Sequence, residues 1–189
     1  MAARDVSQDQ KKAAACRGIV AFEDEASFWL DGSLHWTWAP VGRQPRVDTY
    51  GKRKTGHVFG AVTIETRPRF AYQFAEVFNC NTFIGFLKRL VHRRRRKIFL
   101  IIDNGPCHRL NNDAKAWLKA NRRRIELCRL PPYSPEFNGI EGVWKTTKRQ
   151  TTHNRFFETV EERDAALTAT FERFIAEPQL IAGHVARFL

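Results

Sequence analysis

Apolar residues follow one another without a break in two short stretches of the chain, and both stretches end at acids. Residues 18–22 have the sequence GIVAF and run directly into the acids of residues 23–25. Residues 98–102 have the sequence IFLII and run into Asp103. A continuous apolar run of this length, bounded by polar residues, indicates a strand buried on both faces, as in a parallel or mixed sheet. The pattern predicts two buried strands with acids at their ends.

The rest of the chain shows alternating or helical periods. SFWLD and LHWTWAP, separated by the turn signal Asp31-Gly32, predict a hairpin. Ser134 followed by Pro135 predicts the start of one helix, and a capping box at Thr159 predicts the start of the last. Further strands are expected in GHVFGAVTIE, RFAYQFAEVF and RIELCRL, and helices at about 83–91, 110–121, 135–150 and 159–177.

The order of these elements predicts an α/β fold, a mixed sheet with helices on both faces. A chain of 189 residues is long enough for one domain with a substantial core. Residues 18–177 are interpreted as that domain. The polar residues 1–17 are interpreted as a linker or N-terminal extension, and residues 178–189 as a C-terminal tail.

The net charge of +12 narrows the function classes. Such an excess of Lys and Arg favours a polyanionic partner, most commonly nucleic acid. No stretch approaches the ~18 apolar residues of a membrane-spanning helix, and the first residues lack the apolar core of a signal peptide, so a cytoplasmic location is expected. The four cysteines form no CxxC pair, which favours reduced structural thiols over zinc ligands or disulfides.

Basic residues cluster in several places, and each cluster is either a solvated face or a set of DNA phosphate contacts. The high net charge favours phosphate contacts for at least one cluster. Trp36 and Trp38 are candidates for base stacking, but the core of the predicted hairpin is the preferred interpretation. The candidate DNA-binding residues are Lys52, Arg53, Lys54, Arg93, Arg94, Arg95, Arg96, Lys97, Arg122, Arg123, Arg124, Lys145 and Lys148.

Asp103 and Asp24 are candidate site acids because open α/β sheets present ligand-binding groups at strand carboxyl ends. The alternative for Asp103 is a turn, since Asn104-Gly105 is a hairpin signal, but a helix-like segment follows it instead of a second strand. Asp24 lies on the same side of its strand as Phe22 by the two-residue period. Its alternative is a solvated strand end, which is the expectation for the other two acids of residues 23–25.

Glu141 is the third candidate acid. On a helix it shares a face with Phe137, Ile140 and Trp144, which should be buried, and a carboxylate there is costly unless it is compensated. An ion pair with Lys145 is the alternative, but such pairs contribute only ~0.3–0.5 kcal/mol. A metal ion compensates an inward carboxylate far better, so the metal-site interpretation is favoured.

Two aspartates at strand ends and a glutamate on a nearby helix fit a pair of Mg²⁺ ions. Hard divalent cations prefer carboxylate oxygens and retain waters that a substrate phosphate can replace. Two such ions about 3.5–4 Å apart can hold the attacking and leaving oxygens of a phosphoryl displacement. Asp24, Asp103 and Glu141 are therefore predicted to be both catalytic residues and metal ligands.

Five segments together resemble the catalytic domain of mariner-like bacterial insertion-sequence transposases, part of the DDE superfamily: DEASFWL, WAPVG, DNGPCH, LPPYSPEFN and GIEGVW. The resemblance extends over about 19–174. It implies a ribonuclease H-like fold and Mg²⁺-dependent cutting and joining of DNA at transposon ends, with Mn²⁺ as a substitute for Mg²⁺. Asp24, Asp103 and Glu141 match the three catalytic acids, although the 37 residues between the last two are slightly more than expected.

The resemblance also covers residues around the acids. Asn104, His108 and Asn138 match positions near the metals, with turn and cap roles as the alternative. Gly139 stands where these transposases usually have proline, and glycine is expected to loosen the turn before Glu141 by up to ~1 kcal/mol.

The resemblance further implies partners. Double-stranded DNA is the expected substrate, and a homodimer is expected on it. These transposases normally carry an N-terminal helix-turn-helix region, which is expected to be separate or missing here because only about 17 residues precede the first strand. Two alternatives stay open: a metal-dependent nuclease of the same fold that does not transpose, and a degenerate copy that only binds DNA.

Overall fold

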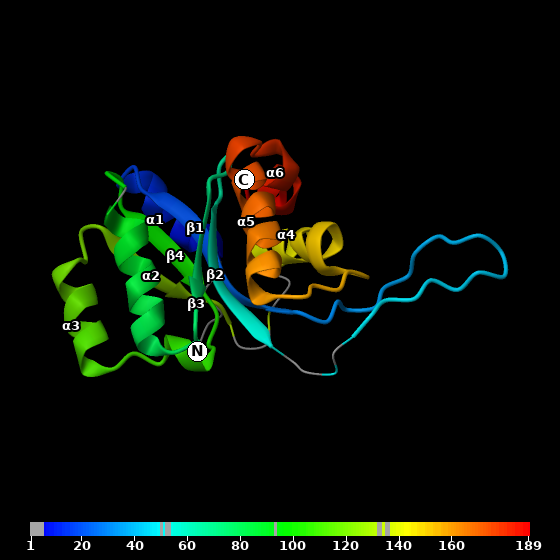
Figure 1. Cartoon of the computed structure of the whole chain (residues 1–189). Coiled ribbons are helices and arrows are strands. Elements are labelled where there is room, and N and C mark those ends of the chain that lie inside the picture. Colours follow the sequence, from blue (N-terminus) through cyan, green and yellow to red (C-terminus); the bar gives the residue numbers. More distant parts are fainter. Residues whose placement is uncertain (1–5, 50, 52–53, 93, 132–133, 135–136) are drawn as a thin grey trace.

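Five strands form one mixed sheet in the order β3-β2-β1-β4-β5 (Figure 1). The computed structural model describes residues 6–49, 51, 54–92, 94–131, 134 and 137–189. β1, β4 and β5 run parallel to one another, whereas β2 is antiparallel to both of its neighbours. The strands are β1 (Ile19–Trp29), β2 (Thr55–Thr63), β3 (Phe70–Ala75), β4 (Ile98–Ile102) and β5 (Ile125–Arg129).

Helices cover both faces of this sheet, as predicted (Figure 1). One face packs against α2 (Cys80–His92) and α3 (Asn112–Ala120). The other face packs against α1, α4, α5 and α6. No helix among the described residues is both long and apolar enough to cross a membrane. The remaining helices are α1 (Val6–Ala15), η1 (Pro106–His108), α4 (Ile140–Thr147), η3 (Lys148–Thr152), α5 (Val160–Ala176), α6 (Gln179–Val185) and η4 (Ala186–Phe188).

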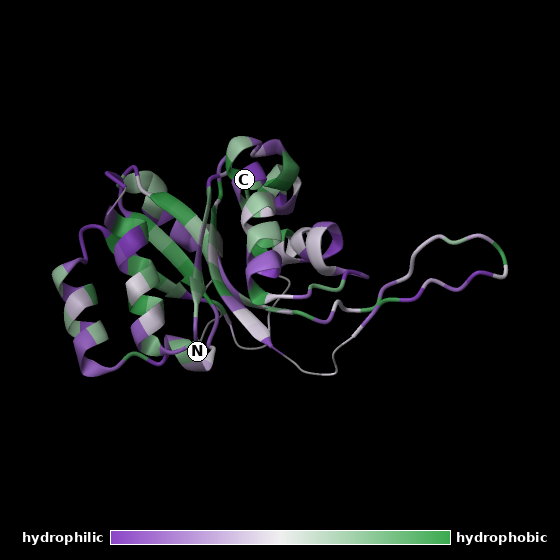
Figure 2. Cartoon of the chain, viewed as in Figure 1, coloured by the Kyte–Doolittle hydropathy of each residue, from purple (hydrophilic) through white to green (hydrophobic). Residues whose placement is uncertain are grey.

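The two central strands are buried on both faces, which confirms the interpretation of their apolar runs. Val20 and Phe22 of β1 pack in the layer of α4 to α6, whereas Ala21 packs in the layer of α2 and α3. All five residues of β4 are buried. Successive side chains of a strand point to opposite faces, so a strand between two helical layers must be apolar throughout. The apolar colour of the strands and of the inward helix faces shows the same layering (Figure 2).

Both ends of the chain belong to the folded domain, within the part that the structure describes. The predicted linker (1–17) contains α1, whose Ala13 is buried in the core and whose Gln10 side chain donates a hydrogen bond to the carbonyl of Phe188. The predicted tail (178–189) contains α6, with Ile181 and Val185 fully buried. These two interpretations are corrected because the two terminal helices together complete one apolar layer.

Residues 31–49, here called the arm, project from the sheet between β1 and β2 and form no strand (Figure 1). The predicted hairpin is therefore wrong: β1 pairs with β2, beginning with Trp29 beside Thr55. Trp36 and Trp38 are 97% and 101% exposed, so they do not form a hairpin core. The local turn signal fails because the partner strand lies beyond the arm.

Helix α4 begins at Ile140, not at 135, with Gly139 as its N-cap. Pro135 lies outside the described residues, and Phe137 is 46% exposed instead of buried. The capping box of α5 is confirmed, since the Thr159 hydroxyl accepts the N–H of Glu162 at 3.1 Å. A side-chain cap is a strictly local contact, which explains why the sequence predicts it well.

Gly60 of β2 lets the ring of Trp144 lie directly on the sheet. A Cβ atom at Gly60 would overlap that ring. We expect Gly60→Ala to destabilise the fold by about 1–3 kcal/mol, because an overpacked core must shift. The melting temperature should fall by on the order of 5 °C.

Gly85→Ala provides the control for this experiment. Gly85 lies in α2, and the nearest atom to its added Cβ is 3.9 Å away. Alanine forms helix better than glycine, so this variant should melt at the wild-type temperature or above it. If Gly60→Ala also melts there, the close approach of Trp144 is not a constraint on the fold.

Candidate functional site

Asp24, in the middle of β1, lies beside Asp103, which directly follows the carboxyl end of β4. The expectation that Asp24 follows the end of its strand is wrong, because β1 continues to Trp29 through its pairing with β2. In the parallel register of β1 and β4, Phe22 is beside Ile101. Two residues further along each strand are Asp24 and Asp103, and adjacent strands are about 4.8 Å apart. Phe22 and Ile101 face the layer that contains α4, so the same two-residue period directs both aspartates to that layer.

Glu141 joins them from the first turn of α4. The start of this helix is tied to β1, since the Asn138 amide donates to the Glu23 carbonyl at 3.4 Å. Gly139 packs close to the strand: an added Cβ would lie 2.9 Å from the ring of Phe22. The glycine that we expect to loosen this turn thus permits a close approach of α4 to β1, and the approach directs Glu141 toward Asp24.

The pKa of Asp24 records this convergence. Burial and, after it, the negative charges of Glu25, Asp103 and Glu141 together raise it from 3.8 to about 7, against a backbone hydrogen bond that lowers it. Among the described residues no ion pair joins Glu141 to Lys145, so the alternative role for Glu141 is not present. Asp24 and Glu141 have no ion pair among the described residues, and carboxylates that repel one another in this way fit the binding of a divalent cation.

The His108 ring forms hydrogen bonds with both Asp103 and Glu23. Its Nδ1 lies 2.7 Å from Oδ1 of Asp103 and its Nε2 lies 3.0 Å from Oε2 of Glu23. The fully buried ring packs edge-on against Phe83. Burial alone would lower the pKa of His108, but hydrogen bonds with Asp103, Cys107 and Glu23 outweigh it and raise the pKa to about 12. A protonated ring can donate to both carboxylates, and its hydrogen bond lowers the pKa of Asp103.

Glu23 is fully buried, although the sequence predicts a solvated strand end. Its side chain points away from Asp24, to the layer of α2, because neighbours on a strand face opposite sides. Burial raises its pKa to about 8 against the opposing hydrogen bond from His108. The expectation is wrong because Glu23 has a partner 85 residues away in sequence, which no local pattern reveals.

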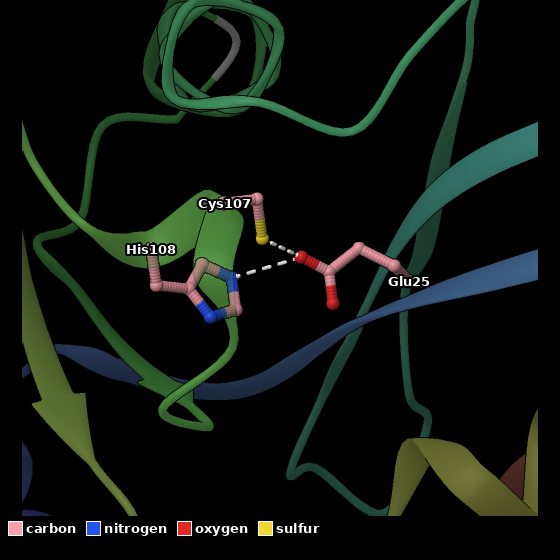
Figure 3. A group of neighbouring side chains, drawn as sticks. All are labelled: Glu25, Cys107 and His108. Carbon is pink, nitrogen blue, oxygen red and sulfur yellow. Dashed lines mark hydrogen bonds and ion pairs between the residues drawn. The ribbon is translucent and has the colours of Figure 1, made fainter.

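Glu25, Cys107 and His108 form a compact group beside the acids (Figure 3). Among the described residues it is the one group of three potential ligands whose atoms all lie within 4.8 Å of one another. The Cys107 thiol donates to Oε1 of Glu25, and burial raises the pKa of this thiol to about 11. A protonated thiol and a protonated imidazole are not metal ligands. This group therefore supports the loop after β4 through hydrogen bonds.

Two further side chains tie the ends of β4 and β5 together. The Asn104 amide donates to the Leu130 carbonyl at 3.0 Å. Arg129 donates to the carbonyls of Asp103 and His108, at 3.3 and 2.6 Å. Asn104 thus has the bracing role of a turn residue. Sequence reasoning missed Arg129, although the register that places it beside Ile102 offers a signal.

The structure does not bring the main basic clusters to the acids. Residues 94–97 and 122–124 precede β4 and β5, at the opposite end of the sheet from Asp103. Lys145 and Lys148 follow Glu141 on α4 and η3, and Lys54 lies at the base of the arm. Lys52, Arg53 and Arg93 lie outside the described residues.

The fold and the site together define a class of protein. A mixed sheet with one acid within a central strand, a second at the end of the parallel strand beside it, and a third on a helix above them is the arrangement of a ribonuclease H-like domain. Residues 19–163 match the family model described as DDE superfamily endonuclease, so the chain belongs to that family. The chemistry of this family is the cleavage of phosphodiester bonds.

Solved structures with the same fold include transposases and an integrase. The Mos1 transposase paired-end complex with left transposon end has a TM-score of 0.60 and 16% identity, over 96% of this chain and 58% of that one. The Mos1 mariner paired-end complex with Mn has a TM-score of 0.63 and 15% identity, over 96% and 55%. The catalytic core domain of BIV integrase has a TM-score of 0.51 and 17% identity, over 82% of each chain.

These comparisons confirm the predicted ribonuclease H-like fold. The chain spans a little over half the length of the Mos1 chains, at 58% and 55%. A comparison with curated protein sequences finds no match.

Proposed function

We propose that this domain cuts DNA strands at transposon ends and joins them to target DNA, as a DDE transposase. The observation that carries the proposal is the convergence of Asp24, Asp103 and Glu141 from three elements. His108 pairs with Asp103, whereas the other two acids have no ion pair among the described residues. The family supports phosphodiester chemistry, and the Mos1 structures include a paired-end complex and a strand transfer complex.

The three acids are proposed to hold two divalent ions, Mg²⁺ or Mn²⁺. Bound ions of this kind polarise a phosphate and stabilise the attacking and leaving oxygens of an in-line displacement. The side chains around the acids prepare them for this role. His108 fixes the orientation of Asp103 through its 2.7 Å hydrogen bond, and Asn138 fixes the start of α4 against β1. The pKa of Asp24 is raised to about 7, so its carboxylate would hold a cation in competition with a proton.

The reaction proceeds in two displacements. In the first, water attacks the scissile phosphodiester, the bond to the 3′ oxygen breaks, and a 3′-hydroxyl is released. In the second, that hydroxyl attacks a phosphodiester of target DNA and displaces another 3′ oxygen. Neither displacement requires a protein-bound intermediate, so no serine or tyrosine nucleophile is needed.

Double-stranded DNA is the proposed partner, with two copies of the chain assembled on it. Base sequence is read mostly through the grooves, commonly by a recognition helix, whereas acids and backbone-binding arginines carry little base information. We therefore assign the reading of transposon ends to a helix-turn-helix region outside these 189 residues.

A nicking and joining assay tests the proposal. With Mn²⁺ or Mg²⁺ the purified chain should nick supercoiled plasmid slowly and with little sequence preference, and EDTA should stop it. A duplex with a free 3′-hydroxyl should be joined to the plasmid in the same buffer. Nicking without joining would replace the proposal with a nuclease of the same fold. Binding without either reaction would indicate a degenerate copy.

A further inference from the structure

The end of the sheet opposite the acids carries a second concentration of charge. A cleft of about 880 Å³ opens there, between the turn after α1 and the segments that precede β4 and β5. Its basic lining residues are Arg17, Arg95, Arg96, Lys97, Arg122 and Arg123.

This cleft is separate from the acids. Lys97 precedes β4 and Asp103 follows it. Six residues of extended chain span about 20 Å at ~3.3 Å each. The two sites are therefore at opposite ends of one rigid strand and cannot contact the same phosphate.

The basic residues of the cleft fall into two groups. Arg96 is engaged, since its guanidinium donates to the carbonyls of Arg17 and Gly18 at 2.8 and 2.6 Å and pairs with Glu65 at 3.3 Å. Lys97 pairs with Glu126 at 2.7 Å. These contacts build the cleft wall.

The second group carries uncompensated charge. Arg95, Arg122 and Arg123 are exposed, and no acidic side chain of the described residues pairs with them. Three unpaired guanidinium groups around one cleft repel one another. An anion with several negative oxygens removes that repulsion.

Arg17 adds an independent observation. Its φ is +52°, in the left-handed region where glycine is favoured. Glycine is the usual residue at such a position after a helix, and it would remove the strain. Strained residues of this kind cluster at binding sites. An arginine in this position is explained by its side chain, which lines the cleft.

A neighbouring cleft extends the same basic surface. It has a volume of about 670 Å³ and lies at the turn between β2 and β3, where Arg67, Arg69 and Arg94 line it. This turn is at the same end of the sheet, because the N–H of Ile64 bonds to the carbonyl of Val20. A ligand with one phosphate would contact only one cleft, whereas a ligand with several linked phosphates can contact both.

We infer that Arg17, Arg95, Arg122 and Arg123 form a second DNA-contact site, which binds the sugar–phosphate backbone of a duplex segment other than the segment at the acids. The inference rests on the proposed function for its choice of DNA as the polyanion. Contacts of this kind are independent of sequence and weaken steeply with salt.

Duplex binding measured in EDTA tests the inference without any cutting. In the triple variant Arg95→Ala, Arg122→Ala and Arg123→Ala, the slope of log affinity against log salt should become shallower by about 2–3, at ~0.9 for each lost phosphate contact. The control removes three exposed charges elsewhere, with Lys88→Ala, Lys115→Ala and Lys119→Ala. Its slope should change by less than 1.

Two further readouts separate binding from folding and from catalysis. Arg17→Gly should melt at a higher temperature than the wild type and yet bind duplex more weakly. In nicking, the triple variant should raise KM and leave kcat unchanged. An unchanged slope in the triple variant, or an equal loss in the lysine control, would overturn the inference. A wild-type chain that binds with these slopes but never nicks would overturn the proposed function alone.

Discussion

Asp24→Asn should raise the melting temperature of the metal-free protein at pH 8 and abolish both its stabilisation by Mn²⁺ and its nicking activity. The pKa of Asp24 is raised in the fold, from 3.8 to about 7. A raised pKa contributes stability that is full below the ordinary value near 4 and is lost as pH rises through about 7. At pH 8 the carboxylate is charged among like charges, and a neutral amide removes that cost.

The gain should be about 2 kcal/mol, or on the order of 5 °C, at pH 8 and close to zero at pH 4. Nicking should fall by roughly 10²–10³-fold or more. The exposed arm residue Asp48 provides the control, since Asp48→Asn removes one charge far from the acids. A metal-free Asp24→Asn protein that melts below the wild type, and that Mn²⁺ still stabilises, would contradict the metal site.

His108→Leu should destabilise the protein by about 3–5 kcal/mol, which lowers the melting temperature by roughly 10 °C. The substitution leaves Glu23 buried without its partner. Adding Glu23→Leu should recover much of the loss, because an apolar pair can replace a buried ionic pair at little cost. The double variant should still fail to nick DNA, because Asp103 has lost the hydrogen bond that orients it.

The stability contributed by His108 is lost over a higher pH range than that contributed by Asp24. With a pKa raised from 6.5 to about 12, His108 contributes stability that is full below pH 6.5 and is lost progressively as pH rises through about 12. The destabilisation by His108→Leu should therefore be largest at pH 6 and smaller at pH 9. His184→Leu is the matched control: that ring makes one hydrogen bond, to Thr146, and should cost about 1 kcal/mol. Additive effects of the two single substitutions would show that Glu23 and His108 are not coupled.

The sequence predicts the placement of the acids because the relevant patterns are local. The apolar runs before Asp24 and Asp103 identify two buried strands, and the two-residue period identifies the face of Asp24. The helical period then places Glu141 with Ile140 and Trp144. Strand parity and helix phase survive folding, so these residues meet on the predicted face, although β1 continues to Trp29 instead of ending before Asp24.

Other features depend on partners far away in the chain. Glu23 is buried because His108 reaches it across 85 positions, and its local pattern is that of a solvated acid. Trp36 and Trp38 follow a local turn signal, but β1 finds its partner only at Thr55. The position of the basic clusters is also not predictable from local sequence. Composition indicates a polyanionic partner, but only the sheet topology shows that residues 94–97 and Asp103 lie at opposite ends of β4.

The arm also gives the protein an intrinsic optical signal. Of the five tryptophans, Trp36 and Trp38 are fully surrounded by water, whereas Trp144 is only 5% exposed. Water relaxes around an excited indole and shifts its fluorescence to longer wavelength, so the red edge of the emission spectrum comes mainly from the arm. Iodide quenches these two residues first. Fluorescence at that edge therefore reports on the surroundings of the arm without any label.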